Sequence, residues 1–330
     1  MAPVKRELPS FDLQELAQIG AGVACQSLSD RLAKALECDG ILYLTNFGIS
    51  EEEFEEFRHV TRAIFDASPE EQEKYIVSGL PLRGLTKLEG ESTAKVLCTG
   101  EHSDLCMKYS WGDAGAVPNV APNDVFKAAW ESTHDKMTAI AKQVLLCIAK
   151  VLDLTDVDAL LNGDALTRHL RYPDVKEERC ADKSDTVERM ATHFDMTLLS
   201  VLCQTPCPNG FVSLQALIGD DWVPVPYVAG TLVVNFGAVL NAITNGRVLA
   251  AKHRVVAPPT ELREGSSRES TVLFYMADPE LLLKPLQGGN GGAVMCFGEP
   301  LPAEGMKAGA FLGQLLSRFK TDQPSPSVVA

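Results

Sequence analysis

The sequence predicts a mainly β protein with helices, in which a double-stranded β-helix (jelly roll) follows an N-terminal helical layer. The first half of the chain is dominated by helical apolar spacing. The second half consists of short β-rich runs separated by turn residues, which is typical of antiparallel sandwiches and barrels. No internal repeat or change of composition separates a second unit, so we expect one domain over residues 1–330.

Residues 1–163 are expected to form the helical layer and the loops of a pocket. The predicted elements are a helix over 27–36, a buried strand over 41–44, helices that begin at Ser50 and Ser68, and a long helix that Asn123 caps and that runs to about Val151. Ser50 and Ser68 each precede an acidic residue at the third helical position, as in a capping box. Residues 79–122 show weak periodicity and are predicted to be irregular.

Residues 164–280 are expected to form the jelly-roll core. Its β-rich runs are 165–172, 192–204, 211–218, 231–240, 248–256 and 269–276. Pro208-Asn209-Gly210 and Asn245-Gly246 are among the turn signals between them. Residues 281–330 are expected to form a C-terminal tail.

Charge and composition exclude several classes of partner. The formal net charge of −14 argues against nucleic acid and against an anionic membrane surface, because both are bound by an excess of Lys and Arg. The nine cysteines are irregularly spaced and include no Cys-x-x-Cys pair, so we expect reduced thiols. The start of the chain lacks the apolar segment of a signal peptide, and we expect a cytoplasmic protein with a small-molecule substrate. The oligomeric state stays open.

Two histidines and one aspartate form the candidate metal site. In a strand, residues i and i+2 point to one face, so His193 and Asp195 would project together. His253 lies in a later strand-like run that a jelly roll can bring alongside. Two imidazoles and one carboxylate on one face are typical of non-haem iron(II) oxygenases and leave positions for a keto acid and dioxygen. A His-x-Asp pair by itself is a weak signal and more often forms a surface hydrogen bond.

Arg268 and Ser270 strengthen the metal interpretation. They share a face at the start of the last apolar strand. A guanidinium and a hydroxyl suit a carboxylate, here the distal carboxylate of 2-oxoglutarate. The alternative for Arg268 is a surface ion pair with Glu264 or Glu269.

Several motifs together resemble a known family. They are Gly40–Thr45, Arg83-Gly84, Leu88-Glu89, Glu91–Ala94, Arg189–Asp195, Gln204–Cys207, Asn209–Gln215 and Gly265–Arg268. They resemble the isopenicillin N synthase-like branch of the iron(II)/2-oxoglutarate dioxygenases, in particular the deacetoxycephalosporin C synthase (expandase) group. The resemblance covers roughly residues 9 to 280.

The resemblance implies both cofactor chemistry and residue roles. It implies that His193, Asp195 and His253 bind iron(II), that Arg268 and Ser270 bind 2-oxoglutarate, and that Met190 packs beside this co-substrate. The implied reaction uses dioxygen to decarboxylate 2-oxoglutarate to succinate and generates an iron(IV)-oxo that abstracts a substrate hydrogen.

Departures from the expandases concern the substrate. Those enzymes carry cations at the places of Leu82, Met276 and, nearby, His169. Losing several cations should cost an anionic substrate about 1.5–3 kcal/mol per charged hydrogen bond. We therefore expect a small neutral or phenol-like cyclic metabolite. The candidate substrate residues are Arg189 or Arg171 as polar anchor, with Arg83, His169, Phe211 and Leu199 around the pocket. For Phe211 and Leu199 the alternative is core packing, and for His169 it is a structural role.

The reaction outcome remains open at this stage. The best-supported expectation is oxidative ring expansion in a secondary-metabolite pathway of the tropolone type. The alternatives are a hydroxylase or desaturase of another natural product, and a true cephalosporin-forming expandase. A catalytically inactive jelly-roll binding protein should have lost part of the metal or Arg-x-Ser set, and a zinc hydrolase would have no use for Arg268 with Ser270.

Overall fold

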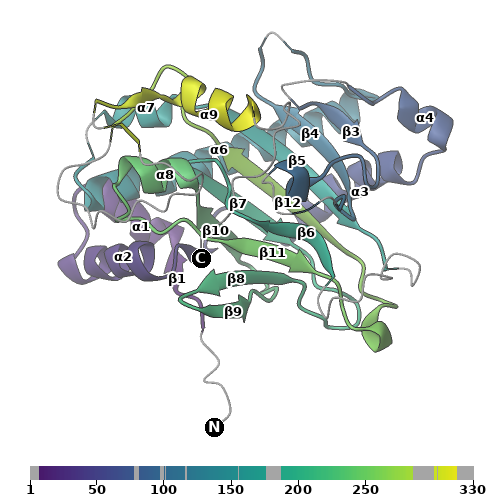
Figure 1. Ribbon diagram of the computed structural model, residues 1–330, viewed down its shortest axis with the longest axis horizontal. Helices are drawn as coiled ribbons and strands as arrows, with labels where there is room; N and C mark the ends of the chain where they lie inside the picture. Colours follow the sequence, from purple (N-terminus) through teal and green to yellow (C-terminus); the bar gives the residue numbers. More distant parts are fainter. Residues whose placement is uncertain are drawn as a thin grey trace.

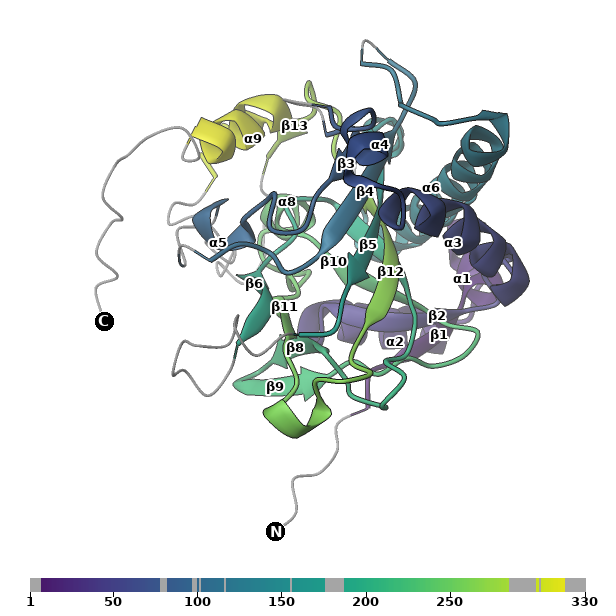
Figure 2. The same cartoon turned by 90° about the vertical axis from the view of Figure 1, so that its right-hand side faces the viewer.

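The computed structural model describes residues 7–77, 82–96, 100, 102–115, 117–154, 156–175, 187–284, 301–302 and 304–317. Two β-sheets face each other, and helices cover the outer side of the larger one (Figure 1). Turned by 90°, the molecule shows β6, β11, β8 and β9 on one side and β4, β5 and β12 on the other, with α1, α3 and α6 beyond them (Figure 2). The predicted fold class, a mainly β jelly roll with a helical layer, is confirmed.

The strands form one large and two small sheets. The large sheet has the order β1 (Ser10–Asp12), β2 (Ile41–Thr45), β10 (Leu232–Phe236), β7 (Leu199–Gln204), β12 (Arg268–Tyr275), β5 (Ala165–Tyr172), β4 (Met107–Gly112) and β3 (Gly84–Thr86). The four-stranded sheet has the order β6 (Glu188–His193), β11 (His253–Val256), β8 (Leu214–Ile218) and β9 (Asp221–Pro224). Near the C-terminus, β13 (Leu282–Leu283) pairs with β14 (Met306–Lys307).

The described helices lie mainly in the N-terminal half. They are α1 (Leu13–Gly20), α2 (Gln26–Cys38), α3 (Glu51–Phe65), α4 (Pro69–Glu73), α5 (Thr93–Val96), α6 (Asp124–Val151), α7 (Val157–Leu161), α8 (Ala238–Ile243) and α9 (Ala308–Ser317). The Ser50 capping box is present, since its hydroxyl accepts from Glu53 N and the Glu53 carboxylate accepts from Ser50 N. Asn123 caps α6 by accepting from Phe126 N. Both helix starts therefore lie where the sequence predicts them.

Strand parity decides what each side of the large sheet contacts. On β7, Leu199, Val201 and Cys203 belong to the apolar cluster that α6 covers. The alternate residue Leu202 faces the other way, into the space between the sheets. On β12 and β5 the even-numbered residues face this interior, so one face of the sheet forms a cavity wall and the other a helix-packed core.

Three expectations about individual elements are corrected. The region 79–122 contains β3 and β4, and the buried polar residues Lys108 and Ser110 hide the apolar pattern of β4. The run 192–204 divides into β6 and β7, so Asp195 lies beyond the end of a strand. The run 231–240 becomes β10 followed by α8, because a fully buried helix has no polar face to show its period. The described residues of the expected tail contain β13, β14 and α9, and its division from the core stays a prediction.

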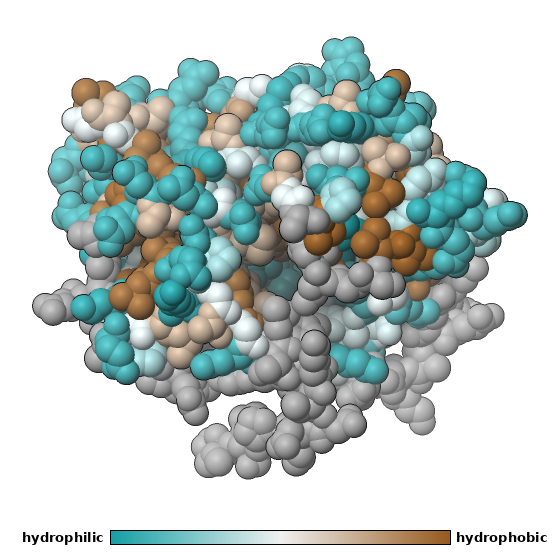
Figure 3. Space-filling model, turned by 90° about the horizontal axis from the view of Figure 1, so that it is seen from above, coloured by the Kyte–Doolittle hydropathy of each residue, from teal (hydrophilic) through white to brown (hydrophobic). Residues whose placement is uncertain are grey.

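The face of the molecule seen in Figure 3 is mostly polar where its residues are described. Seen from above, hydrophilic side chains predominate and apolar ones occur in small separate groups (Figure 3). The exposed large apolar side chains of the described residues come from separate elements: Val23, Ile76, Val125, Val228, Leu262 and Leu282. Among the helices that the structure describes, none is both long enough and apolar enough to cross a membrane.

Candidate metal centre and cavity

His193, Asp195 and His253 converge at one end of the cavity between the sheets. His193 ends β6 and His253 begins β11, and the two residues are direct partners across these antiparallel strands. Asp195 Oδ1 lies 3.6 Å from His193 Nε2 and 3.9 Å from His253 Nε2. The three potential ligand atoms all lie within 4.8 Å of one another. This is the size of site that one metal ion can fill.

Backbone carbonyls fix the orientation of both imidazoles. His193 Nδ1 lies 2.7 Å from Ala191 O, and His253 Nδ1 lies 2.8 Å from Ala251 O. A carbonyl can only accept, so each Nδ1 carries the proton and each Nε2 keeps its lone pair for a metal. Burial, followed by the neighbouring His253, lowers the pKa of His193 to about 4. The imidazole of His193 is therefore neutral at pH 7, as a ligand must be.

Asp195 is held through one oxygen and presents the other. Its Oδ2 accepts from Ser200 Oγ at 2.6 Å and from Asn235 Nδ2 at 2.5 Å. Burial alone would raise the pKa of Asp195, but His253, His193 and these two hydrogen bonds lower it. An ionised Oδ1 thus faces the two Nε2 atoms. This set of two imidazoles and one carboxylate fits iron(II), which binds such mixed N and O ligands.

A β-bulge on β6 brings Met190 to the same cavity. Val255 pairs with Met190 and His253 with His193, so three steps on β6 match two on β11. The extra residue lets two positions an odd number apart both face the interior. Met190 therefore lines the same cavity as the cluster, and its packing beside 2-oxoglutarate stays a prediction.

Arg268 is a buried cation without an acidic partner among the described residues. Its guanidinium donates to Gln204 Oε1 at 3.0 Å and lies 5.3 Å from the centre of the Tyr172 ring. Burial lowers the pKa of Arg268 from its ordinary value. Ser270, two residues along β12, faces the cavity with it. A buried guanidinium needs an anion, and the carboxylate of 2-oxoglutarate fits this need.

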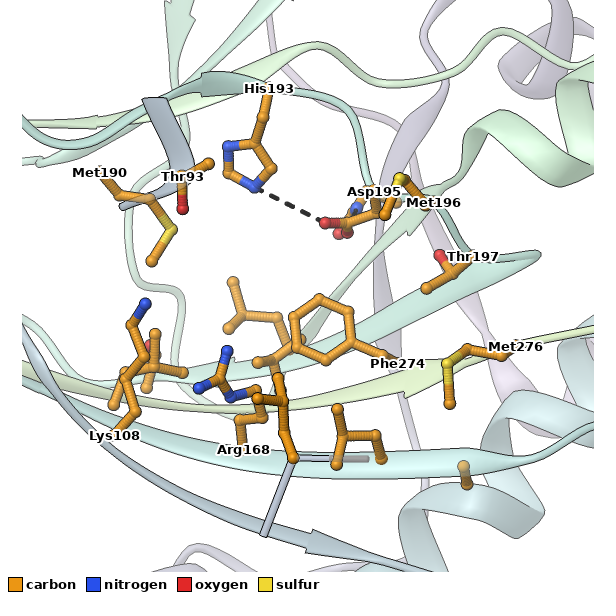
Figure 4. A pocket seen from close by; sticks show the side chains of 18 of the residues that line it. Thr93, Lys108, Arg168, Met190, His193, Asp195, Met196, Thr197, Phe274 and Met276 are labelled. Atoms are coloured by element: carbon orange, nitrogen blue, oxygen red, sulfur yellow. Dashed lines mark hydrogen bonds and ion pairs between the residues drawn. The ribbon is translucent and has the colours of Figure 1, made fainter. Parts of the chain in front are cut away.

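The cavity has a volume of about 790 Å³. Its walls are mainly apolar and include Leu170, Leu202, Val233, Val272 and Phe274. The close-up shows Phe274 and Met276 on the wall opposite Asp195, and Lys108 and Arg168 across from His193 (Figure 4). Leu312 of α9 also lines the cavity, so the C-terminal segment contributes to its wall.

Two family models match the chain, and the C-terminal one contains the three residues of this site. Residues 166–277 match the 2OG-Fe(II) oxygenase superfamily, and residues 8–125 match the N-terminal region described as non-haem dioxygenase in morphine synthesis. Deacetoxycephalosporin C synthase of Amycolatopsis lactamdurans is 34% identical over 274 residues, which covers 81% of this chain and 83% of that protein. The chain belongs to the 2OG-Fe(II) oxygenase superfamily. The predicted family, enzyme class and use of iron(II) and 2-oxoglutarate are confirmed.

Other relatives of this oxygenase differ in the reaction that they catalyse. Deacetoxycephalosporin C hydroxylase of Streptomyces clavuligerus is 35% identical over 243 residues, covering 71% of this chain and 75% of that protein. A kainoid synthase of Pseudo-nitzschia multiseries is 25% identical, covering 86% and 76%. A full-length Neurospora crassa protein, solved in complex with α-ketoglutarate, has a TM-score of 0.74 at 20% identity, covering 97% of this chain and 98% of that chain. This last similarity concerns the fold.

Of the predicted substrate residues, Arg83 lines the cavity of this oxygenase. Its guanidinium donates to Leu82 O at 2.8 Å and to Asp113 O at 3.3 Å. His169 and Arg171 lie on the opposite face of β5, because they alternate with the inward Arg168 and Tyr172. There His169 packs between Phe57 and Phe65, and Arg171 pairs with Asp66. Neither residue lines the main cavity, and their contact with substrate stays a prediction.

Three further expected substrate contacts also lie elsewhere. Arg189 is fully buried, donates to the backbone carbonyls of Ser266 and Pro173, and lies 5.1 Å from the Tyr172 ring centre. Leu199 packs in the helix-covered core. Phe211 lines a second, smaller cavity of about 120 Å³ on the other side of Arg268. None of the three lines the main cavity described here.

The sequence reading missed several residues that line or support the site. Arg168 and Tyr172 could have been found from strand parity, because β5 begins where the sequence predicts it. Lys108 gave no signal, since its segment was expected to be irregular. Asn235 and Ser200 act on Asp195 through contacts between distant strands, which no local pattern shows.

Proposed function

We propose that this oxygenase oxidises a small, neutral cyclic secondary metabolite, with oxidative ring expansion of the tropolone type as the outcome. The observation that carries this proposal is the cavity itself. Its walls are mainly apolar, and it is large enough for a ring next to the co-substrate. An apolar wall favours a ring without ionised groups, because burying an unpaired charge there is costly.

The roles proposed for the site residues follow from their geometry. His193, Asp195 and His253 hold the metal through Nε2, Oδ1 and Nε2. Arg268 and Ser270 hold the distal carboxylate of 2-oxoglutarate, with Met190 packed beside it. When bound, iron(II) supplies the activation of dioxygen that this family needs. The apolar walls exclude water and position the ring next to the metal.

The relatives support more than one outcome on the same scaffold. A synthase and a hydroxylase of cephalosporin chemistry are both about one-third identical to this chain. Hydroxylation or desaturation of another natural product is therefore the alternative, and cephalosporin formation the second one. Neither Arg189 nor Arg171, the two alternatives for a polar anchor, lines the main cavity, which supports a substrate without an ionised group.

A coupled turnover assay tests the proposal. The iron-loaded enzyme is screened with neutral ring ketones and phenols, and separately with penicillin N, while succinate release and substrate loss are both measured. We expect succinate release coupled to the loss of a neutral ring compound, with a product of changed ring size. Efficient conversion of penicillin N, with neutral compounds inert, would contradict the proposal.

A further inference from the structure

Two cations on the inner face of the large sheet lie apart from the metal and the 2-oxoglutarate residues. Lys108 on β4 and Arg168 on β5 are both buried and both line the main cavity. Figure 4 shows their nitrogen-bearing ends directed into the cavity from the side opposite His193. None of the roles proposed so far uses them.

The acids that balance these cations lie behind them. Glu91 bridges the pair, with Oε2 2.7 Å from Lys108 Nζ and Oε1 2.7 Å from Arg168 Nη2. Asp104 Oδ2 lies 2.6 Å from Lys108 Nζ. Neither acid lines the cavity. Burial alone would raise the pKa of Glu91, but Arg168 and Lys108 lower it to about 2. The Glu91 carboxylate that bridges the two cations is therefore ionised.

The cations keep hydrogen-bond donors for a ligand. An ammonium has three N–H groups, and two of those on Lys108 point to Glu91 and Asp104. Arg168 donates through Nε to Ser110 Oγ at 3.0 Å and through Nη2 to Glu91. In the described ranges, Arg168 Nη1 and the third Lys108 hydrogen have no protein acceptor. Both side chains border the cavity, so an acceptor on a ligand that lies there can take these hydrogen bonds.

The charge balance selects the kind of acceptor. Two cations and two carboxylates already neutralise each other, so a further buried carboxylate would be an uncompensated charge. A carbonyl or phenolic oxygen accepts the same hydrogen bonds without adding a charge. The site therefore suits an uncharged oxygen.

The strand register places this site beside the co-substrate. Ser270 on β12 pairs with Leu170 on β5, which in turn pairs with Lys108 on β4. Two strand spacings of about 4.8 Å each separate Ser270 from Lys108. Lys108 Nζ is held by Glu91 and Asp104 two strands away from Ser270, so we treat the two sites as separate and able to be filled together.

We propose that Lys108 and Arg168 form a substrate subsite that binds a carbonyl or phenolic oxygen on the ring of the substrate. The inference rests on the proposed function, whose neutral ring it makes specific: the substrate is a phenol or ring ketone, oriented by this oxygen. Lys108 is then a specificity-determining residue.

Binding of simple aromatic probes tests the subsite without a known substrate. The enzyme with iron(II) and 2-oxoglutarate, kept free of oxygen, is dialysed to equilibrium against 4-nitrophenol in its neutral form, nitrobenzene or 4-nitrobenzoate. The variant combines Lys108→Met with Asp104→Asn, which removes one cation and one anion together. We expect its affinity for 4-nitrophenol to fall about ten-fold, the effect of one charged hydrogen bond, while nitrobenzene is unaffected.

A second variant and a co-substrate control make the result decisive. The double variant Arg168→Met with Glu91→Gln should weaken the binding of 4-nitrophenol by a similar factor. It provides the test if the first variant does not fold. The affinity for 2-oxoglutarate should stay unchanged in both. Equal binding of 4-nitrophenol and nitrobenzene to the wild-type enzyme, or tighter binding of 4-nitrobenzoate, would overturn the subsite. A lack of turnover with neutral rings despite intact 4-nitrophenol binding would instead contradict the proposed function.

Discussion

At the scale of single residues, the metal centre depends on which atom of each side chain is occupied. Backbone carbonyls accept hydrogen bonds from Nδ1 of His193 and of His253. Ser200 and Asn235 donate hydrogen bonds to one oxygen of Asp195. What remains are two lone pairs and one carboxylate oxygen that face each other. These contacts orient the three proposed ligands in the metal-free structure, which would lower the cost of binding a metal there.

His169 offers a test of buried charge at the same scale. Burial, followed by Arg58, Arg62 and Arg171, lowers the pKa of His169 from 6.5 to about 3. Between pH 6.5 and 3 this histidine binds a proton more readily in the unfolded chain than in the folded one. The free energy of unfolding is therefore at its full value above pH 6.5 and falls as the pH falls toward 3.

In the metal-free protein we expect His169→Gln to change the pH dependence of stability. Between about pH 7 and about pH 5, the free energy of unfolding should fall about 2 kcal/mol more in the wild type than in this variant. Urea unfolding at both pH values measures the difference. His59→Gln, at an exposed histidine of α3, is the control and should follow the wild type. Parallel behaviour of all three proteins would show that His169 does not titrate as described.

At the scale of strands and helices, parity accounts for both the successes and the errors of the sequence reading. Arg268 and Ser270 were placed correctly because β12 begins at Arg268 and its even-numbered residues face the cavity. Leu199, His169 and Arg171 occupy the opposite parity and meet helices instead. The alternation of side chains along a strand can be predicted from the sequence. Which of the two faces meets the cavity depends on how α6 packs on the sheet, and that packing cannot be predicted from the sequence.

The two leucines of β7 test this assignment. Leu202→Phe adds volume toward the cavity, so we expect little change in stability and weaker binding of ring substrates. Leu199→Phe adds the same atoms in the packed core and should destabilise the fold by about 1–3 kcal/mol. Urea unfolding of the two variants measures this contrast. Equal destabilisation would mean that Leu202 is also core.

At the scale of the whole molecule, the site is assembled from segments that are distant in the chain. The two histidines meet because β6 and β11 pair, and Asp195 is fixed by β7 and β10 of the other sheet. The ligand set could be predicted, because its spacing and the Arg-x-Ser pair are local signals. Lys108, Asn235 and Leu312 could not, because each reaches the site only through tertiary packing. The division into helical layer, core and tail stays a prediction, and β1 to β4 of the N-terminal half join the large sheet.

Anaerobic absorption spectroscopy tests the central claim most directly, namely that one iron(II) and one 2-oxoglutarate bind together at His193, Asp195, His253 and Arg268. A metal-to-ligand charge-transfer band should appear when the wild-type protein receives both iron(II) and 2-oxoglutarate. Arg268→Ala should raise the 2-oxoglutarate concentration needed by about ten-fold or more. Arg171→Ala, which removes a guanidinium from the other face of the neighbouring strand, should leave it unchanged. Absence of the band in the wild type, or an unchanged half-saturating 2-oxoglutarate concentration in Arg268→Ala, would contradict the account.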